Sequence, residues 1–347
     1  ERLMYNNAMG FLFEPDWDID RRRLRDAVVA VIGEYPFMRV HAAQKNGIAS
    51  LVYDADCAID VPITEKPAAT TDELIASFAQ PFDLECGPLF RFEVCACRDG
   101  VVLLGDMHHI IADGTSTALF YDRVAQVFGG KDLGAQTVDS FMVANAHEAA
   151  RKSGRTQRDQ EFFDAMLDGV EVDSSPIADD RAILEEDRPV SRGVDVSVRD
   201  EKTLASIAAC TRATGITESS LFLGAYLYAL AKSSGQSEVL ACMAENGRHD
   251  PALGATFGML VKTLPLYTTI DETERTAAFL ERIQDLQFSC MEHDQCSFVE
   301  LAARHNVRSD VMFVYQGDML SGIDLDGRFV AMRRAPHEDA MATIALS

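Results

Sequence analysis

The sequence predicts a mixed, two-layer α/β fold made of two lobes. Short apolar runs typical of β-strands alternate along the chain with stretches in which apolar residues recur at helical spacing. A polar, acidic stretch that contains Pro176 and Pro189 separates two halves of this same character. The 347 residues, of which 47% are hydrophobic, are ample for a large core. We therefore expect a first lobe over residues 1–165, a linker over residues 166–192 and a second lobe over residues 193–347.

The first half begins with a short apolar strand at residues 11–13 and a helix that Asp20 caps. One face of this helix is apolar, through Leu24, Val28, Val31 and Ile32. Pro36 ends the helix, because proline cannot continue the hydrogen-bond ladder. An Asn-Gly turn then joins two strands, which cover residues 40–41 and 50–53.

A helix over residues 72–79 is followed by a β-hairpin. The two hairpin strands cover residues 91–97 and 101–107, and the Asp-Gly pair between them is typical of a tight turn. The half closes with a charged helical stretch over residues 144–169.

The second half repeats this alternation without repeating the sequence. The expected strands cover residues 194–198, 238–243 and 311–315. The expected helices cover residues 202–214, 219–232, 273–290 and 297–303.

The segment His108-His109-Ile110-Ile111-Ala112-Asp113-Gly114 directly follows the second hairpin strand. After it, apolar residues return to helical spacing, with Thr115 or Ser116 available as the helix cap. A strand end, a short loop and a helix start form a rigid base on which folds place reactive groups. The segment is therefore our candidate active site.

The adjacency of the two histidines limits what they do together. Successive side chains of an extended backbone point to opposite faces, so His108 and His109 are expected to have different surroundings. This argues against a metal site that uses both rings. One histidine then serves the framework, and the other is free to exchange a proton with an amine or a hydroxyl near neutral pH. The structural alternative is a strand-end histidine pair with Asp113 as a helix cap.

The composition excludes several classes of partner. Lys and Arg total 32 against 55 Asp and Glu, a formal charge of −23 that repels nucleic-acid phosphates and anionic membranes. The 8 cysteines form no CxxC pair and no zinc-type cluster with histidine, which favours a reducing compartment. No signal peptide is visible in the sequence, and no apolar run reaches membrane-spanning length. We expect a cytoplasmic protein without a metal.

Further motifs accompany this segment in a recognisable order. Residues 107–116, MHHIIADGTS, fit an HHxxxDG signature. The other motif-like segments are residues 34–39, 81–91, 246–248, 257–266, 293–301 and 311–316. Together they resemble the condensation domain of nonribosomal peptide synthetases, a member of the chloramphenicol-acetyltransferase-like superfamily, over nearly the whole chain.

The resemblance implies two chloramphenicol-acetyltransferase-like lobes in a V, with a channel between them. It implies a donor carrier domain that presents an acyl or peptidyl thioester on phosphopantetheine, and an acceptor carrier domain that presents an aminoacyl thioester. The amine attacks the donor carbonyl and forms an amide. No cofactor is bound by the domain itself, and an adenylation domain is expected in the same polypeptide.

The resemblance also suggests roles for individual residues. His109 accepts the proton of the attacking amine or holds the amine by a hydrogen bond. Gly114 starts the helix whose amides face the developing oxyanion, and a Cβ there would crowd the thioester. His108 is a framework residue. Asp113 is a structural carboxylate that pairs with Arg248 across the lobes.

The chain also departs from the family pattern. Lys262 and Val314 stand where asparagines are usual, and the opening Ser-x-Ala-Gln motif of the family is absent or cut away. The last family segment is also missing, so we expect the second lobe to be truncated. Lys262 is expected at the surface rather than near the channel.

Three alternatives stay open: an acyltransferase of the same superfamily that acts on a hydroxyl, an epimerisation domain in which His109 moves an α-proton, and a non-catalytic module that docks carrier domains. A glycerol-phosphate-type acyltransferase, which the spacing of His108 and Asp113 also suggests, fits poorly because it has no place for the other motifs.

Overall fold

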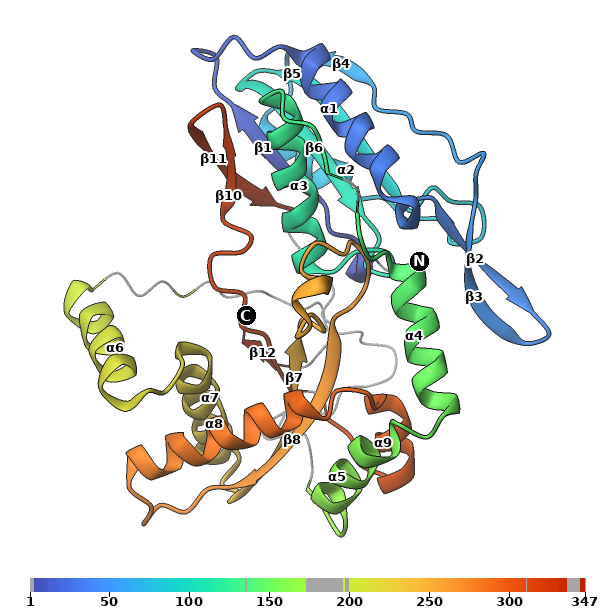
Figure 1. The fold of residues 1–347 in the computed structure, drawn as a ribbon. Helices are drawn as coiled ribbons and strands as arrows, with labels where there is room; N and C mark the ends of the chain where they lie inside the picture. The colour runs from blue at the N-terminus through green and yellow to red at the C-terminus, as the bar shows by residue number, and fades with distance from the viewer. Residues whose placement is uncertain are drawn as a thin grey trace, which may run out of the picture. The chain divides into compact units, whose positions relative to one another are not determined.

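The computed structural model describes residues 3–134, 136–172, 196, 200–309, 311–335 and 344–346, and it has the mixed α/β fold expected from the sequence (Figure 1). The chain divides into two compact units. Unit 1 contains the chain up to Asn145, the segment Arg248–Leu260, and the chain from Gln316 through strand β11 (Arg328–Arg334). Unit 2 contains Ala146–Gly247, Val261–Tyr315 and strand β12 (Ile344–Leu346).

Unit 1 is built on a six-stranded sheet in the order β10-β11-β1-β6-β5-β4. The strands are β1 (Met9–Phe13), β4 (Ile63–Lys66), β5 (Phe90–Cys97), β6 (Gly100–Met107), β10 (Gly322–Leu325) and β11. β5 and β6 form the expected hairpin, with Cys97 opposite Gly100 at the turn. β6 is central, because it pairs antiparallel with both β5 and β1.

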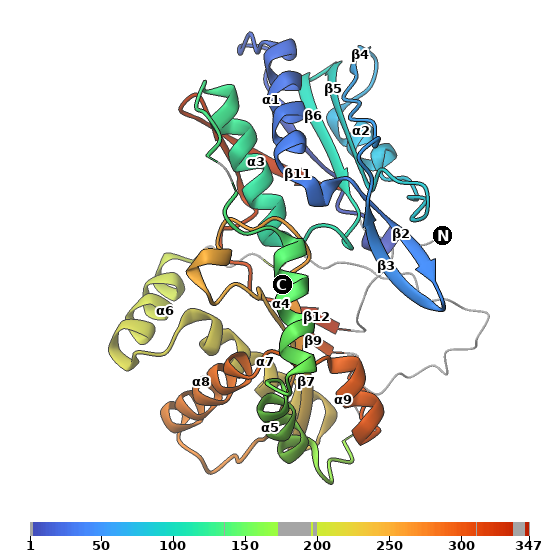
Figure 2. The same cartoon turned by 45° about the vertical axis from the view of Figure 1, so that its right-hand side comes forward.

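Helices cover both faces of this sheet (Figure 2). α1 (Arg21–Glu34) and α3 (Gly114–Phe128) bury their apolar faces on one side, together with aromatic residues of β1 and β5. α2 (Thr71–Phe78) packs on the other side. Asp20 caps α1 as expected, through bonds from the amides of Arg22 and Arg23. The sheet is therefore buried on both faces, and β6 delivers the chain from its centre to the start of α3.

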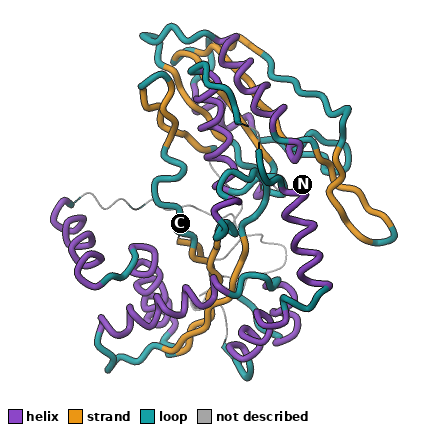
Figure 3. Tube along the Cα trace, viewed as in Figure 1, coloured by secondary structure: helices purple, strands orange, loops and turns teal. Residues whose placement is uncertain are grey.

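The remaining parts of unit 1 are short. β2 (Val40–Lys45) and β3 (Ile48–Tyr53) form the hairpin expected around Asn46-Gly47, and it extends away from the large sheet (Figure 3). Single 3-10 turns cover Leu3–Tyr5, Pro36–Met38 and Pro251–Leu253.

Unit 2 has a four-stranded sheet in the order β12-β9-β7-β8. Its other strands are β7 (Glu238–Glu245), β8 (Lys262–Thr269) and β9 (Val311–Phe313). Its helices are α5 (Gln157–Leu167), α6 (Glu201–Thr214), α7 (Glu218–Ser234), α8 (Thr276–Glu292) and α9 (Phe298–His305). α5, α7, α8 and α9 contribute buried residues to the core of this unit, whereas α6 contributes none.

The units do not follow the boundaries that we expected at residues 165 and 193. The division falls inside α4 (Ser140–Lys152), and two later segments return to unit 1. The second of these segments does so because its strands β10 and β11 extend the sheet of unit 1 at β1. The expected linker over residues 166–192 and the expected strand over residues 194–198 lie largely outside the described residues. The V-shaped arrangement of the lobes stays a prediction.

The charged stretch over residues 144–169 is also not a single helix. It contains the end of α4 and all of α5, separated by a turn at Gly154, whose φ is +73°. A left-handed residue interrupts an α-helix, so the chain changes direction there.

Gly105 in β6 is a position of close approach. A Cβ built on it would lie 2.0 Å from the Tyr121 hydroxyl and 2.8 Å from the Phe92 ring. We predict that Gly105→Ala lowers the free energy of unfolding by about 1–3 kcal/mol, because the buried neighbours must move. Urea unfolding measures this. Gly33→Ala in α1, where nothing lies within 4 Å of the new Cβ, is the control and should not destabilise. An equal loss in both variants would contradict the packing argument.

Candidate active site

The end of β6 holds the first histidine rigidly. The His108 amide donates to the Leu89 carbonyl (2.9 Å), and the ring Nδ1 accepts from the Ile110 amide (3.1 Å). The His108 ring also lies against two aromatic rings, Tyr5 at 5.9 Å and Phe82 at 6.0 Å between centroids. The hydrogen bond and the aromatic neighbours hold the His108 ring in place, and its role as a framework residue stays a prediction.

The ring of His109 has a different environment. Its backbone amide donates to the Tyr5 carbonyl (2.7 Å), so the residue itself is fixed. The ring is half-buried, and its Nδ1 is buried without a hydrogen-bond partner among the described residues. Buried polar nitrogens are normally hydrogen-bonded, so an uncommitted imidazole is available to a bound molecule.

Asp113 carries both roles that the sequence suggested for it. It is the N-cap of α3, since its Oδ1 accepts from the Ser116 amide (2.8 Å), so neither Thr115 nor Ser116 is the cap. Its Oδ2 accepts from Arg248 Nη1 (2.9 Å) and from the Leu260 amide (2.8 Å). The expected ion pair is therefore present, and it is buried, with side-chain exposures of 3% for Arg248 and 2% for Asp113.

Arg248 extends this network to the chain around Gly258. Its Nη2 donates to Asp113 Oδ1 (3.1 Å), to Ser116 Oγ (2.9 Å) and to the Thr256 carbonyl (3.1 Å). Ser116 Oγ in turn donates to the Gly258 carbonyl (2.7 Å) and accepts from the Gly258 amide (2.9 Å). A bidentate guanidinium–carboxylate pair with further bonds is among the stronger polar contacts in proteins.

We expected this pair to join two lobes, and that expectation was wrong. Arg248 and the segment that it opens, Arg248–Leu260, belong to unit 1, as does Asp113. The segment joins unit 1 because its polar backbone is satisfied there, by Asp113 at Leu260 and by Ser116 at Gly258. The ion pair thus fastens a returning stretch of chain to the start of α3.

Gly114 is the first residue of α3, and it has more space than we expected. A Cβ there would meet only Leu320 Cδ1, at 3.7 Å, which is an ordinary van der Waals contact. Its φ lies outside the left-handed range, so a side chain causes no backbone strain. Any effect of a larger residue must therefore come from a bound substrate. The expected crowding of a thioester stays a prediction.

The sequence did not identify the chain that passes next to Gly114. Leu320 is its nearest neighbour, and Thr115 Oγ1 contacts Met319 Sδ at 3.5 Å. It also missed Ser116 as a member of the buried network. Sequence separations of more than 130 residues from Ser116 to its partners Gly258 and Arg248 leave no local signal.

Lys262 is not the surface lysine that we expected. Its Nζ lies 2.9 Å from Asp294 Oδ2, and the side chains are only 16% and 11% exposed. Both residues belong to unit 2. Val314, the other departure from the family pattern, is half-buried directly after β9. Where the family usually has asparagine, this chain thus has a lysine that forms a largely buried ion pair with Asp294.

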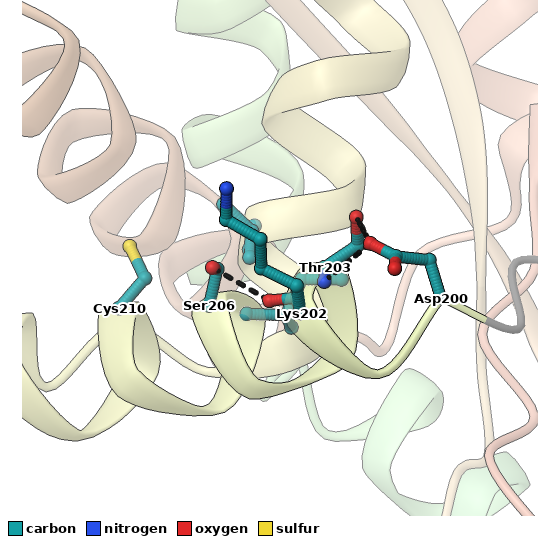
Figure 4. A pocket seen from close by; sticks show the side chains of 7 residues that line it. Asp200, Lys202, Thr203, Ser206 and Cys210 are labelled. Atoms are coloured by element: carbon teal, nitrogen blue, oxygen red, sulfur yellow. Dashed lines mark hydrogen bonds between the residues drawn. The ribbon is translucent and has the colours of Figure 1, made fainter.

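One open pocket lies in unit 2, along α6 (Figure 4). Its polar groups bond to their own helix. Thr203 Oγ1 donates to the Asp200 carboxylate (2.6 Å), and Ser206 Oγ donates to the Lys202 carbonyl (2.7 Å). These contacts are those of a helix start.

The described residues show neither a metal site nor a membrane span. They contain no group of three or more His, Cys, Asp and Glu side chains placed to hold a metal ion. No helix within them is both long enough and apolar enough to cross a membrane.

Comparison with known proteins identifies the family. The model of the condensation domain matches residues 2–333. The chain belongs to the condensation-domain family. Bacitracin synthase 3 of Bacillus licheniformis is 26% identical to it over 339 residues, which is 94% of this chain and 5% of that synthase. The chain thus spans a small part of the curated relatives that it matches.

Solved condensation domains share the fold. The condensation domain of a monacolin K polyketide synthase is 18% identical, with a TM-score of 0.78 that covers 96% of this chain and 80% of the other. The epimerization domain from the third module of tyrocidine synthetase B has a TM-score of 0.74 at 16% identity, covering 90% of this chain and 77% of the other. The condensation-domain fold is therefore shared by domains with more than one activity.

The ion pair gives a stability prediction. Asp113→Ala leaves Arg248 charged and buried, so we predict a loss of about 3–5 kcal/mol in the free energy of unfolding. Arg248→Ala should lose a similar amount, and the double variant less than the sum of the two. Urea unfolding of the three variants measures the coupling.

Asp20→Ala is the matched control. Asp20 caps α1 in the same way but has no buried partner, so its loss should be only about 1 kcal/mol. Strictly additive losses at Asp113 and Arg248 would contradict the pairing.

Gly114 gives a prediction about turnover. We predict that Gly114→Val lowers amide formation from carrier-loaded substrates by about 10-fold or more through crowding, while the melting temperature changes little. Gly33→Val is the control, since it places the same side chain in α1, where a Cβ meets nothing within 4 Å. Full turnover by Gly114→Val would show that this position does not face the substrate.

Proposed function

We propose that this domain forms an amide bond between a carrier-bound acyl or peptidyl thioester and a carrier-bound aminoacyl group, in nonribosomal peptide synthesis. The observation that carries the proposal is the His109 ring. Its buried Nδ1 has no partner among the described residues, whereas His108 and Asp113 in the same loop are firmly bonded. Membership of the condensation-domain family supports the same reaction.

His109 has the chemistry that the reaction needs. The acceptor amine attacks the thioester carbonyl carbon, and the N–C bond forms as the carbonyl π electrons move to oxygen. The imidazole takes the proton that the amine nitrogen loses, or holds the amine until that proton leaves. The tetrahedral intermediate then expels the donor thiolate, which takes up a proton to become the free thiol of phosphopantetheine.

The start of α3 suits the developing oxyanion. Asp113 bonds the amide of Ser116 through its side chain and that of Thr117 through its carbonyl, so the amides of Gly114 and Thr115 are the ones at the start of α3 that this cap leaves for a ligand. The positive end of the helix dipole adds to their attraction for negative charge. Asp113 has a structural role in this scheme, since its oxygens are occupied by Arg248, Ser116 and Leu260.

Holding two tethered reactants together supplies much of the acceleration in such a reaction. The partners in this proposal are a donor and an acceptor peptidyl carrier domain, each with phosphopantetheine, and an adenylation domain in a longer polypeptide. Relatives such as bacitracin synthase 3 are named as synthases, which fits this setting. We place the protein in the cytoplasm.

Epimerisation is the second candidate, because an uncommitted imidazole can also move the α-proton of an aminoacyl group. The epimerization domain with the same fold motivates it. Donor-loaded and acceptor-loaded carriers, incubated with the protein and analysed by mass spectrometry and chiral chromatography, separate the two reactions. We expect the amide. Inverted acceptor without amide would favour epimerisation, an ester with an alcohol acceptor would favour hydroxyl acylation, and unchanged carriers would favour a docking module.

His109→Ala tests the assigned role. We predict a loss of roughly 10²–10⁴-fold in the single-turnover rate of amide formation, because the proton acceptor is gone. The melting temperature should stay close to wild type, since no hydrogen bond of the ring is lost among the described residues. His108→Ala is the contrasting variant, and it should melt lower because the Ile110 amide loses its acceptor. A folded His109→Ala protein with near-wild-type rate would remove His109 from the mechanism.

A further inference from the structure

A buried carboxylate that the proposed reaction does not use lies just before the histidine pair. Asp106 in β6 is fully buried, at 0% exposure. Its Oδ2 accepts a hydrogen bond from Asn6 Nδ2 (2.8 Å) and lies 3.8 Å from Arg91 Nη1, and the backbone amide of Asn7 also favours the charged carboxylate. Its Oδ1 is buried without a partner among the described residues. So few contacts compensate poorly for burying a charge, and burial raises the pKa of the Asp106 carboxyl to about 6.

Asn6 connects this carboxylate to one side of the histidine pair. Besides its bond to Asp106, its Nδ2 donates to the Gln80 carbonyl (2.8 Å). Its backbone forms an isolated bridge with His108, and the Asn7 amide donates to the Met107 carbonyl (3.1 Å). The neighbouring carbonyl, that of Tyr5, accepts from the His109 amide. Asp106 thus anchors the strip of chain to which both histidines are bonded.

Arg91 connects the carboxylate to the other side. It lies directly opposite Asp106 in the β5–β6 ladder. Its Nη2 donates to the Pro81 carbonyl (3.1 Å), and its guanidinium stacks on the Phe82 ring at 3.9 Å. The Phe82 ring meets the His108 ring edge-on. The charge on Asp106 therefore helps to hold Arg91 in place, and Arg91 in turn holds the Phe82 ring that packs against His108.

We propose that Asp106 is a positioning residue, whose ionised carboxylate holds Asn6 and Arg91 and through them sets the place of the His108–His109 pair. The proposal rests on the amide-forming function proposed above. Asp106 itself touches no reacting atom in this scheme. It acts through the two segments, residues 5–7 and 78–82, that flank the histidines.

The charged and titratable groups around Asp106 define the effect of pH. Arg91 faces it from β5, and His108 follows it two residues later in the same extended run. Tyr121 of α3 lies across the strand, over Gly105. Protonation of Asp106 removes the attraction for Arg91 and so loosens the support of Phe82. The hold on the histidines is therefore present at high pH and is lost as the pH falls through about 6.

The same group has the opposite effect on stability. Its pKa in the fold is above the ordinary value, so the folded state binds the proton more tightly than the unfolded chain does. Its contribution to folding is therefore more favourable at low pH and is lost as the pH rises through about 6. A neutral side chain of the same shape should then make the protein more stable above this pH and also less active.

Asp106→Asn tests both effects. At about pH 8, kcat for amide formation from loaded carriers should fall roughly 10- to 100-fold, because small displacements of catalytic groups are costly. KM for the carriers should be unchanged. The ratio of wild-type to variant kcat should approach one at about pH 5, where Asp106 is protonated. The ratio isolates Asp106, because every other group is the same in both proteins. The melting temperature should rise by about 2–4 °C at about pH 8 and match wild type at about pH 5.

Asp99→Asn is the matched control at the other end of the same hairpin. Asp99 accepts from the Thr71 amide (2.7 Å), and this bond holds the pKa of its carboxyl below the ordinary value. The kcat ratio for this variant should be independent of pH, and its melting temperature should fall at about pH 8.

Two results for Asp106→Asn would overturn the proposal: an unchanged kcat at about pH 8, or a loss of kcat together with a loss of melting temperature at every pH. Hydrogen exchange of the wild-type protein is a second test that needs no variant and no activity. Protection factors at the Asn7 and His109 amides should fall as the pH drops through about 6, and constant protection would also overturn the proposal. If the wild-type protein forms no amide, the proposed function fails. Hydrogen exchange and the melting temperatures still test whether Asp106 positions the histidines.

Discussion

The buried pair between Asp113 and Arg248 is the interaction on which the rest of the site depends. It caps α3, fixes the loop that follows the histidines, and ties the segment Arg248–Leu260 to unit 1 through Ser116 and Leu260. A desolvated carboxylate is tolerated there because guanidinium and amide donors satisfy it. Asp113 and His108 are held by hydrogen bonds, whereas the His109 Nδ1 has no partner among the described residues, so a rigid loop carries an available imidazole.

Two buried carboxylates near the histidines, Asp113 and Asp106, differ in how well their charge is compensated. Asp113 is fully compensated, so it can serve as structure. Asp106 is not fully compensated, so its ionised form is energetically unfavourable in the folded protein. Poorly compensated buried groups that persist in a fold are often connected to function. The charge of Asp106 can affect His108 through three direct contacts: Asp106 with Arg91, Arg91 with Phe82, and Phe82 with His108.

Local signals in the sequence were sufficient for much of unit 1. The Asp20 cap, the Asn46-Gly47 hairpin and the β5–β6 hairpin follow from residues close in the chain, and all are present. β8 was missed because Pro265 lies within it, and β10–β11 were missed although Asp326-Gly327 marks their turn. Even a correct assignment of these strands would not have given their partner, since β11 pairs with β1 from the opposite end of the chain. The unit to which Arg248 belongs could not be predicted for the same reason.

The most direct test of this account is a structure of the protein with an acceptor amine attached to phosphopantetheine through a stable thioether. We predict that the amine nitrogen lies about 3 Å from a ring nitrogen of His109, within hydrogen-bond reach. We also predict that Asp113 keeps its bonds to Arg248 and to the Leu260 amide in the complex. An amine bonded to the Asp113 carboxylate, with the His109 ring turned away from it, would contradict the account and make Asp113 the catalytic group.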